Sequence, residues 1–177
     1  MSNIQKTDLN STGYIKAIFG PMFSGKTSYL IDYFLKNQKA YVFKPSKDNR
    51  YSDSNIVSHN QHQVKAQNII DTADILTIVK DKESIIIIDE IQFFDETIVD
   101  VCKQLRFNGH NVLVAGLDYD SDQKDFKTSS LISKITDQVV ILEGTCAQCG
   151  QPAPHTYCKS LSKETQIAIG GPEMYES

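Results

Sequence analysis

A glycine-rich stretch near the start of the chain carries the residue types that bind phosphate. Residues 20–27 read GPMFSGKT and fit the pattern G-x-x-x-x-G-K-[ST]. Between a strand and a helix, a loop of this spacing directs backbone N–H groups around phosphate oxygens, and its glycines allow the turn. Lys26 supplies a charge to the β- and γ-phosphates, and Thr27 a hydroxyl to Mg²⁺. The sequence therefore predicts a nucleoside triphosphate site at Gly20, Pro21, Met22, Phe23, Ser24, Gly25, Lys26 and Thr27.

Two consecutive carboxylates, Asp89 and Glu90, follow the apolar run of residues 85–88. A carboxylate at the carboxyl end of a buried strand can reach Mg²⁺ directly or through water, which makes Asp89 a candidate metal ligand. Glu90 is a candidate general base, because a nucleophile that attacks the γ-phosphate must lose a proton. Many ATPases also carry Asp-Glu here and use the glutamate to activate water. The pair alone therefore does not distinguish a kinase from a hydrolase.

Apolar runs and amphipathic stretches alternate around these residues. We expect strands over residues 14–19, 40–43, 84–89, 111–116, 138–142 and 165–171, and helices over 26–36, 68–79 (starting near Asp71) and 97–107, with a further helical piece after the polar stretch 118–128. The run SIIIID at 84–89 is typical of a strand buried on both faces of a parallel sheet. Strands that alternate with helices predict an α/β fold with right-handed crossovers.

Composition limits the classes of protein to consider. The 177 residues are 40% hydrophobic and 23% charged, which predicts one globular domain with a small appendage. We divide the chain into a flexible tail (1–13), a nucleotide-binding α/β domain (14–142) and a small turn-rich module (143–177). A net charge of −4 argues against a nucleic-acid surface, and the longest apolar run is too short to cross a membrane. The polar N-terminus lacks the layout of a signal peptide, so we expect a cytoplasmic protein.

Several motifs occur together and in a fixed order along the chain. They are GPMFSGKT, FKPSKDNRYS with SHN, DEIQFF, AGLDYD, and CAQC followed by IGGPEMY. In this combination, from Gly20 to Tyr175, the chain resembles the type II thymidine kinases, which phosphorylate the 5′-hydroxyl of thymidine. The resemblance implies a P-loop (RecA-like) parallel sheet flanked by helices, with a small C-terminal zinc-knuckle or lasso module. It also implies ATP and Mg²⁺ as cofactors, thymidine as substrate, dTTP as feedback inhibitor and a homotetramer.

The resemblance implies roles for individual residues as well. Glu90 would take the proton of the 5′-hydroxyl, and Arg50 would help to neutralise the charge that develops during transfer. Thr27 and Asp89 would hold Mg²⁺, and Gln92 would join the loop and Asp89 in binding the nucleotide. The implied substrate-binding residues are Met22, Asp48, Phe93, Leu117, Phe126, Thr156 and Tyr175. Without the motifs, Arg50 would be interpreted as a solvated loop charge and Phe93 as a core aromatic.

One departure from the family pattern concerns the nucleoside base. Ser121 stands where family members usually carry a phenylalanine that stacks on the base. Loss of an aromatic face could cost roughly 1–3 kcal/mol of binding free energy. Tyr119 could substitute for it if the loop shifts.

The second departure concerns zinc. Cys146-x-x-Cys149 is half of a knuckle, whereas structural zinc requires four ligands in a tetrahedron. The second Cys/His pair that the resemblance implies beyond Tyr175 is missing. Either His155 and Cys158 complete a local site, or zinc is absent or weakly bound, or the sequence is truncated.

Two other functions remain open beside thymidine phosphorylation. One is a P-loop ATPase or switch that uses Asp89 and Glu90 to hydrolyse ATP. The other is a degenerate kinase that binds nucleotide with little turnover. Nucleoside-stimulated ATP consumption would separate the kinase from the ATPase, and binding without turnover would indicate the degenerate kinase.

Overall fold

A computed structural model of the chain describes residues 13–37, 39–46, 55–57, 63–159 and 174–177. Its centre is a six-stranded sheet, ordered β5-β2-β6-β7-β1-β8, in which every neighbouring pair is parallel. The strands of this sheet are β1 (Ile15–Phe19), β2 (Ala40–Pro45), β5 (Gln67–Ile69), β6 (Ile85–Ile88), β7 (Asn111–Gly116) and β8 (Gln138–Ile141). The predicted parallel α/β fold is confirmed.

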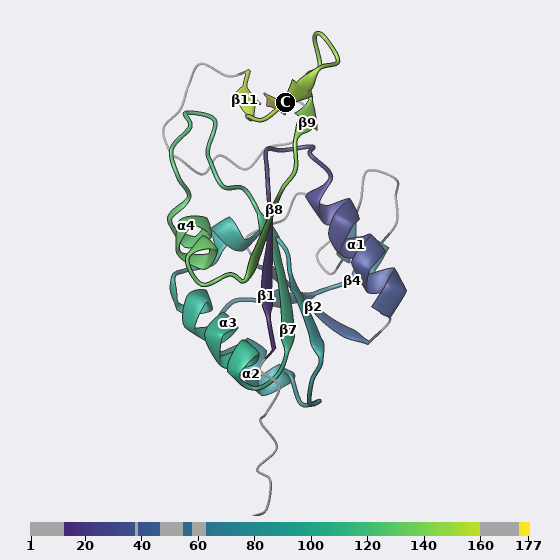
Figure 1. Cartoon of the computed structure of the whole chain (residues 1–177), viewed down its shortest axis with the longest axis vertical. Helices are drawn as coiled ribbons and strands as arrows, with labels where there is room; N and C mark the ends of the chain where they lie inside the picture. The colour runs from purple at the N-terminus through teal and green to yellow at the C-terminus, as the bar shows by residue number, and fades with distance from the viewer. Residues whose placement is uncertain (1–12, 38, 47–54, 58–62, 160–173) are drawn as a thin grey trace, which may run out of the picture.

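Helices cover both faces of the sheet (Figure 1). One face carries α1 (Lys26–Asn37), and the other carries α2 (Asp74–Ile78), α3 (Thr97–Phe107) and α4 (Lys127–Ser133). A short 3-10 helix, η1 (Ile91–Phe93), follows β6.

Strand β6 shows why the central strands are apolar without alternation. Ile86 and Ile88 pack into the core under α2 and α3, and Ile87 packs into the core under α1. All three side chains are fully buried. A strand in the middle of a parallel sheet is covered on both faces, so every position favours an apolar residue.

Helix α3 begins and ends where its sequence predicts. Its buried residues are Ile98, Val99, Val101, Cys102 and Leu105, and all but Val99 recur at the three- or four-residue spacing of one helical face. Gly109 then adopts φ 87°, and its N–H donates to the Arg106 carbonyl at 3.0 Å. Glycine adopts this left-handed conformation without a Cβ penalty, which ends the helix.

The segment of residues 68–79 differs from the predicted helix. Gln67–Ile69 is the edge strand β5, with Asn68 opposite Lys44 of β2. The helix is confined to α2, and Asp71 accepts the N–H of Ala73 with its side chain at 2.9 Å. Pairing with β2 gives this stretch backbone partners that local helical propensity could not reveal. The strand expected over 165–171 lies outside the described residues.

Among the described residues, four antiparallel strands lie in a small C-terminal module, and two more pair in a separate hairpin. The module contains β9 (Gly144–Thr145) with β10 (Pro152–Ala153), and β11 (Tyr157–Cys158) with β12 (Tyr175–Glu176); the hairpin contains β3 (Asn55–Val57) and β4 (Gln63–Lys65). The module lies beyond the carboxyl ends of β1 and β8 (Figure 1). No helix among the described residues is long and apolar enough to cross a membrane.

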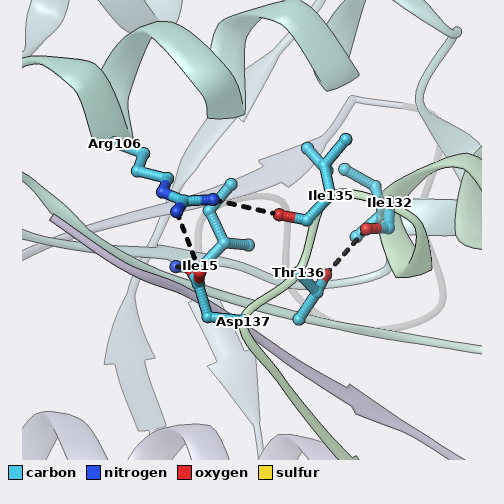
Figure 2. Close-up of polar contacts among 6 residues, drawn as sticks. All are labelled: Ile15, Arg106, Ile132, Ile135, Thr136 and Asp137. Carbon is cyan, nitrogen blue, oxygen red and sulfur yellow. Dashed lines mark hydrogen bonds and ion pairs between the residues drawn. The ribbon is translucent and has the colours of Figure 1, made fainter. Parts of the chain in front are cut away.

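A polar cluster joins α3, β1 and the turn before β8 at the opposite end of the sheet (Figure 2). Arg106 pairs with Asp137 at 2.9 Å and donates to the Ile135 carbonyl at 3.4 Å. The second carboxylate oxygen of Asp137 accepts the N–H of Ile15 at 2.8 Å. The cluster therefore fixes the start of β1, the strand that leads into the glycine-rich loop.

Candidate active site

The glycine-rich loop connects the end of β1 to the start of α1, as predicted. Gly20 has φ 147°, and a Cβ there would lie 2.2 Å from the Leu142 carbonyl oxygen, so only glycine allows this approach to the end of β8. Gly25 has φ 88°, and no described heavy atom would lie within 4 Å of a Cβ there. The start of α1 therefore faces open space, where its backbone N–H groups favour an anion.

Lys26 lies within the curve of this loop. Its ammonium group is buried and donates to the carbonyl oxygens of Gly20 at 3.0 Å and Pro21 at 2.6 Å. The positive charge is therefore located where the motif requires it. Phosphate oxygens that enter the loop would compete with these two carbonyls for the ammonium group.

Thr27 and Asp89 meet although they lie on different elements. The hydroxyl of Thr27, on α1, donates to Asp89 Oδ2 at 3.1 Å, and the N–H of Glu90 donates to Asp89 Oδ1 at 2.9 Å. Asp89 is only 4% exposed, and burial raises its pKa to about 7; the negative charge of Glu90 adds to this shift, and hydrogen bonds and the charge of Lys26 oppose it. A hydroxyl and a carboxylate are the hard oxygen ligands that Mg²⁺ prefers, so the pair fits a magnesium ion.

Glu90 connects β6 to η1 in an unusual backbone conformation. Its φ and ψ are 55° and 46°, in the left-handed region that residues other than glycine seldom adopt. The N–H of Phe93 donates to its carbonyl at 3.0 Å, which closes the turn into η1. Such strained conformations persist only where the surroundings enforce them, and they gather at functional sites.

Gln92 links Glu90 to the end of β7. Its Nε2 donates to Glu90 Oε2 at 2.5 Å, and its Oε1 accepts the N–H of Leu117 at 3.0 Å. The side chain is 5% exposed. The structure thus brings three of the predicted site residues into direct contact.

Met22 connects the glycine-rich loop to the C-terminal module. Its N–H donates to the hydroxyl of Thr156 at 2.9 Å, and its carbonyl accepts the hydroxyl of Ser177 at 3.0 Å. Thr156 is buried. Both backbone polar groups of Met22 are therefore bonded within the protein.

The other residues expected at the nucleoside belong to four different elements or loops. Leu117, Phe126 and Tyr175 are buried and Phe93 is half-buried. The Leu117 carbonyl accepts the hydroxyl of Ser129 at 2.6 Å, which connects the end of β7 to α4. Asp48 and Arg50 lie outside the described residues.

The loop that carries Ser121 is organised by a buried carboxylate. Asp120 Oδ1 accepts the N–H groups of Asp122 at 2.8 Å and Lys124 at 2.9 Å. Tyr119 forms an isolated β-bridge with Asp125 and is 43% exposed. The exposed ring of Tyr119 is thus the aromatic group in this loop, beside the partly exposed Ser121.

The local four-ligand zinc site, one of the three alternatives that the sequence left open, is not assembled. Among the described residues, no group of three or more His, Cys, Asp or Glu side chains could hold a metal ion. Cys146 and Cys149 do lie in one turn, where the backbone N–H of Cys149, followed by that of Gln148, lowers the pKa of the Cys146 thiol. His155 is exposed and Cys158 half-buried, and these two side chains do not form such a group with Cys146 and Cys149.

Two contributors to the site were not predicted from the sequence. Ser177 holds the carbonyl of Met22, and Gly116 leaves space beside Gln92. A glycine at the end of an apolar strand is the signal that could have identified Gly116, since glycine there often marks a close approach. No comparable signal marks Ser177.

These features define a P-loop nucleotide-binding protein. They are a parallel α/β sheet, a GxxxxGKT loop at a helix N-terminus and an aspartate at the end of a nearby strand. A family model described as thymidine kinase matches residues 13–177. A thymidine kinase from Rhodothermus sp. (strain ITI 518) is 36% identical over 170 residues, which cover 94% of this chain and 79% of that protein. The chain therefore belongs to the thymidine kinase family and is an enzyme of that kind.

Two solved structures resemble the fold more distantly. The RuvB Holliday junction branch migration motor of Thermotoga maritima has a TM-score of 0.45 and 13% identity over 73% of this chain, which spans 38% of that chain. The cytoplasmic domain of the type VII secretion ATPase EccC of Thermomonospora curvata has a TM-score of 0.45 and 13% identity over 82% of this chain, which spans 21% of that one. The family assignment does not depend on either likeness.

Proposed function

We propose that this kinase transfers the γ-phosphoryl group of ATP to the 5′-hydroxyl of thymidine, with Glu90 as the general base and residues 20–27 around the triphosphate. Membership of the thymidine kinase family supports the reaction. The observation that carries the residue assignment is the contact between Thr27 and Asp89, which brings the loop to the peptide that also carries Glu90.

Each residue then has a defined task. The N–H groups at the start of α1 and the ammonium group of Lys26 bind phosphate oxygens, and Thr27 and Asp89 would hold Mg²⁺. The ion, when bound, neutralises charge on the phosphates. Glu90 accepts the proton that the 5′-hydroxyl loses as its oxygen attacks phosphorus.

The nucleoside is proposed to lie where the end of β7, the start of α4 and the C-terminal module face the loop. Buried side chains from these elements offer an apolar surface for the base and deoxyribose. The proposed residues are Met22, Phe93, Leu117, Phe126, Thr156 and Tyr175, with Asp48 near the reacting centre and Arg50 beside the transferred group. Tyr119 is the proposed aromatic partner of the base, because Ser121 cannot stack.

Further features of the family are proposals for this chain. One is the RecA-like subclass of the P-loop fold, which the position of β7 between β1 and β6 supports. The others are the division of the chain into a tail, an α/β domain and a C-terminal module at residues 13 and 142, a homotetramer, inhibition by dTTP and a cytoplasmic location. Zinc is not assigned a role.

The test is a coupled assay of phosphate transfer from ATP and Mg²⁺ to thymidine, deoxyuridine, deoxycytidine or no nucleoside. Thymidine-dependent turnover should fall by roughly 10²–10⁴-fold in Glu90→Ala. Glu96→Ala is the matched control, because Glu96 is 52% exposed and its pair with Lys127 is solvated, so turnover should be unchanged. Hydrolysis that does not need a nucleoside would indicate the ATPase, and ATP binding without turnover would indicate a degenerate kinase.

A further inference from the structure

We propose that Gln92 is a positioning residue for the phosphoryl transfer, because its side-chain amide holds the Glu90 carboxylate at a fixed distance from the end of β7. This inference rests on the proposed role of Glu90 as the base. It assigns Gln92 a task other than the nucleotide binding that the family resemblance implies.

The hydrogen bonds of the Gln92 amide allow only one orientation. The N–H of Leu117 can only donate, so the group 3.0 Å from it must be Oε1. An ionised carboxylate can only accept, so the group 2.5 Å from Glu90 Oε2 must be Nε2. A side chain that ends in one acceptor and one donor satisfies both Leu117 and Glu90. The amide of glutamine supplies this acceptor and donor at the side-chain length that the site requires.

The surroundings restrict the amide further. Gln92 is 5% exposed, its bond to Leu117 is buried and its bond to the half-buried Glu90 is partly buried, so water has little access to the amide. A Cβ at Gly116 would lie 2.4 Å from Gln92 Oε1 and 2.7 Å from Ile91 Cγ2. Gly116 does not adopt a positive φ, so its lack of a side chain provides space for the amide rather than backbone freedom.

This arrangement links the proposed base to the proposed nucleoside site. Leu117 is the first residue after β7, and its N–H is one end of the link; Glu90 is the other end. Misplacement of a reacting group by about 1 Å can lower the rate by roughly 10²-fold. Fixing Glu90 relative to Leu117 would therefore set the distance between the base and the 5′-hydroxyl.

Two substitutions separate this role from a purely structural one. Gln92→Glu keeps an acceptor for the N–H of Leu117 and loses the donor to Glu90 only where the new carboxyl is ionised, whereas Gln92→Met loses both bonds at every pH. We expect kcat for thymidine phosphorylation to fall at least about tenfold in Gln92→Met, and in Gln92→Glu to fall as the pH rises and the new carboxyl ionises, with KM for ATP and for thymidine within about threefold of wild type. Gln104→Glu and Gln104→Met, on the exposed face of α3, are the matched controls and should leave both constants unchanged.

A third variant tests the position of the amide without changing Gln92. Gly116→Ala should displace Oε1 and lower kcat in the same way, with KM retained. Binding of a fluorescent ATP analogue reports whether each variant is folded, and Gly116→Ala serves as the test if Gln92→Met does not fold.

The outcomes are distinguishable. A variant that binds the ATP analogue, whether Gln92→Met or Gly116→Ala, and keeps kcat within twofold of wild type overturns the inference and leaves the proposed function standing, provided that wild type turns over and Glu90→Ala does not. A rise in KM for ATP with kcat retained also overturns it, because that result indicates nucleotide binding. Absence of thymidine-dependent turnover in wild type overturns the proposed function and the inference together.

Discussion

The hydrogen bond from Met22 to Thr156 joins the glycine-rich loop to the C-terminal module, and Thr156→Val removes it at nearly constant volume. The N–H to hydroxyl distance is 2.9 Å, and Thr156 is 8% exposed, so little water can replace the lost acceptor. A buried donor left without a partner costs about 1–3 kcal/mol. Ser177 still donates to the Met22 carbonyl in this variant, so the cost should be local.

Amide hydrogen exchange measures this bond directly, because the Met22 N–H is its donor. A loss of about 1–3 kcal/mol should raise the exchange rate of that amide by roughly 5–150-fold. Thr156→Ser is the matched control, because serine retains the hydroxyl; its Met22 amide should exchange within about twofold of wild type.

Two results would refute this reasoning. If the Met22 amide of Thr156→Val exchanged as slowly as that of wild type, Thr156 would not be its acceptor in solution. If Thr156→Ser exchanged as fast as Thr156→Val, the lost methyl group would be responsible rather than the hydroxyl.

Two further predictions concern stability in urea. His110 is 5% exposed and accepts the Ser84 N–H at 3.1 Å, and burial lowers its pKa below the ordinary 6.5. As pH falls, the histidine of the unfolded chain therefore binds a proton before His110 of the folded protein does. His110 should then reduce the free energy of unfolding below about pH 6.5, by at most about 1.4 kcal/mol per pH unit. His110→Gln should lack this pH dependence, and an equal pH dependence in wild type and variant would contradict the prediction. Asp137→Ala should lower the free energy of unfolding by about 1–2 kcal/mol, because the N–H of Ile15 loses its acceptor. Asp137→Asn keeps an acceptor and loses only the ion pair with Arg106, whose side chain is 38% exposed beside the 37% exposed Asp137, so it should cost less than about 1 kcal/mol. Equal losses in the two variants would show that the ion pair dominates.

The central strands and helix α3 could be predicted because local sequence determines them. Residues 85–88 and 112–115 are continuous apolar runs, as double burial requires, and the structure places β6 and β7 there. Helix α3 has one apolar face and a terminating Gly109. The phosphate loop could be predicted for a similar reason, since its function depends on consecutive backbone groups.

The contacts between distant segments could not be predicted in this way. Strand β5 exists because β2 lies beside it, and residues 67–69 alone carry no sign of that neighbour. Ser177 and Met22 are separated by 155 positions. A single sequence contains no measure of such proximity, so these contacts appear only once the chain is folded.

The left-handed conformation of Glu90 explains how one strand end can supply both the proposed metal ligand and the proposed base. In an extended strand, consecutive side chains point to opposite faces of the sheet, so two adjacent carboxylates would be separated by the sheet itself. The positive φ of Glu90 ends this alternation immediately after Asp89 and turns the chain into η1. The same turn returns Gln92 to the carboxylate of Glu90, while Asp89 keeps its contact with Thr27. The left-handed conformation of Glu90 is therefore the structural condition under which the proposed ligand and the proposed base can serve one reacting centre.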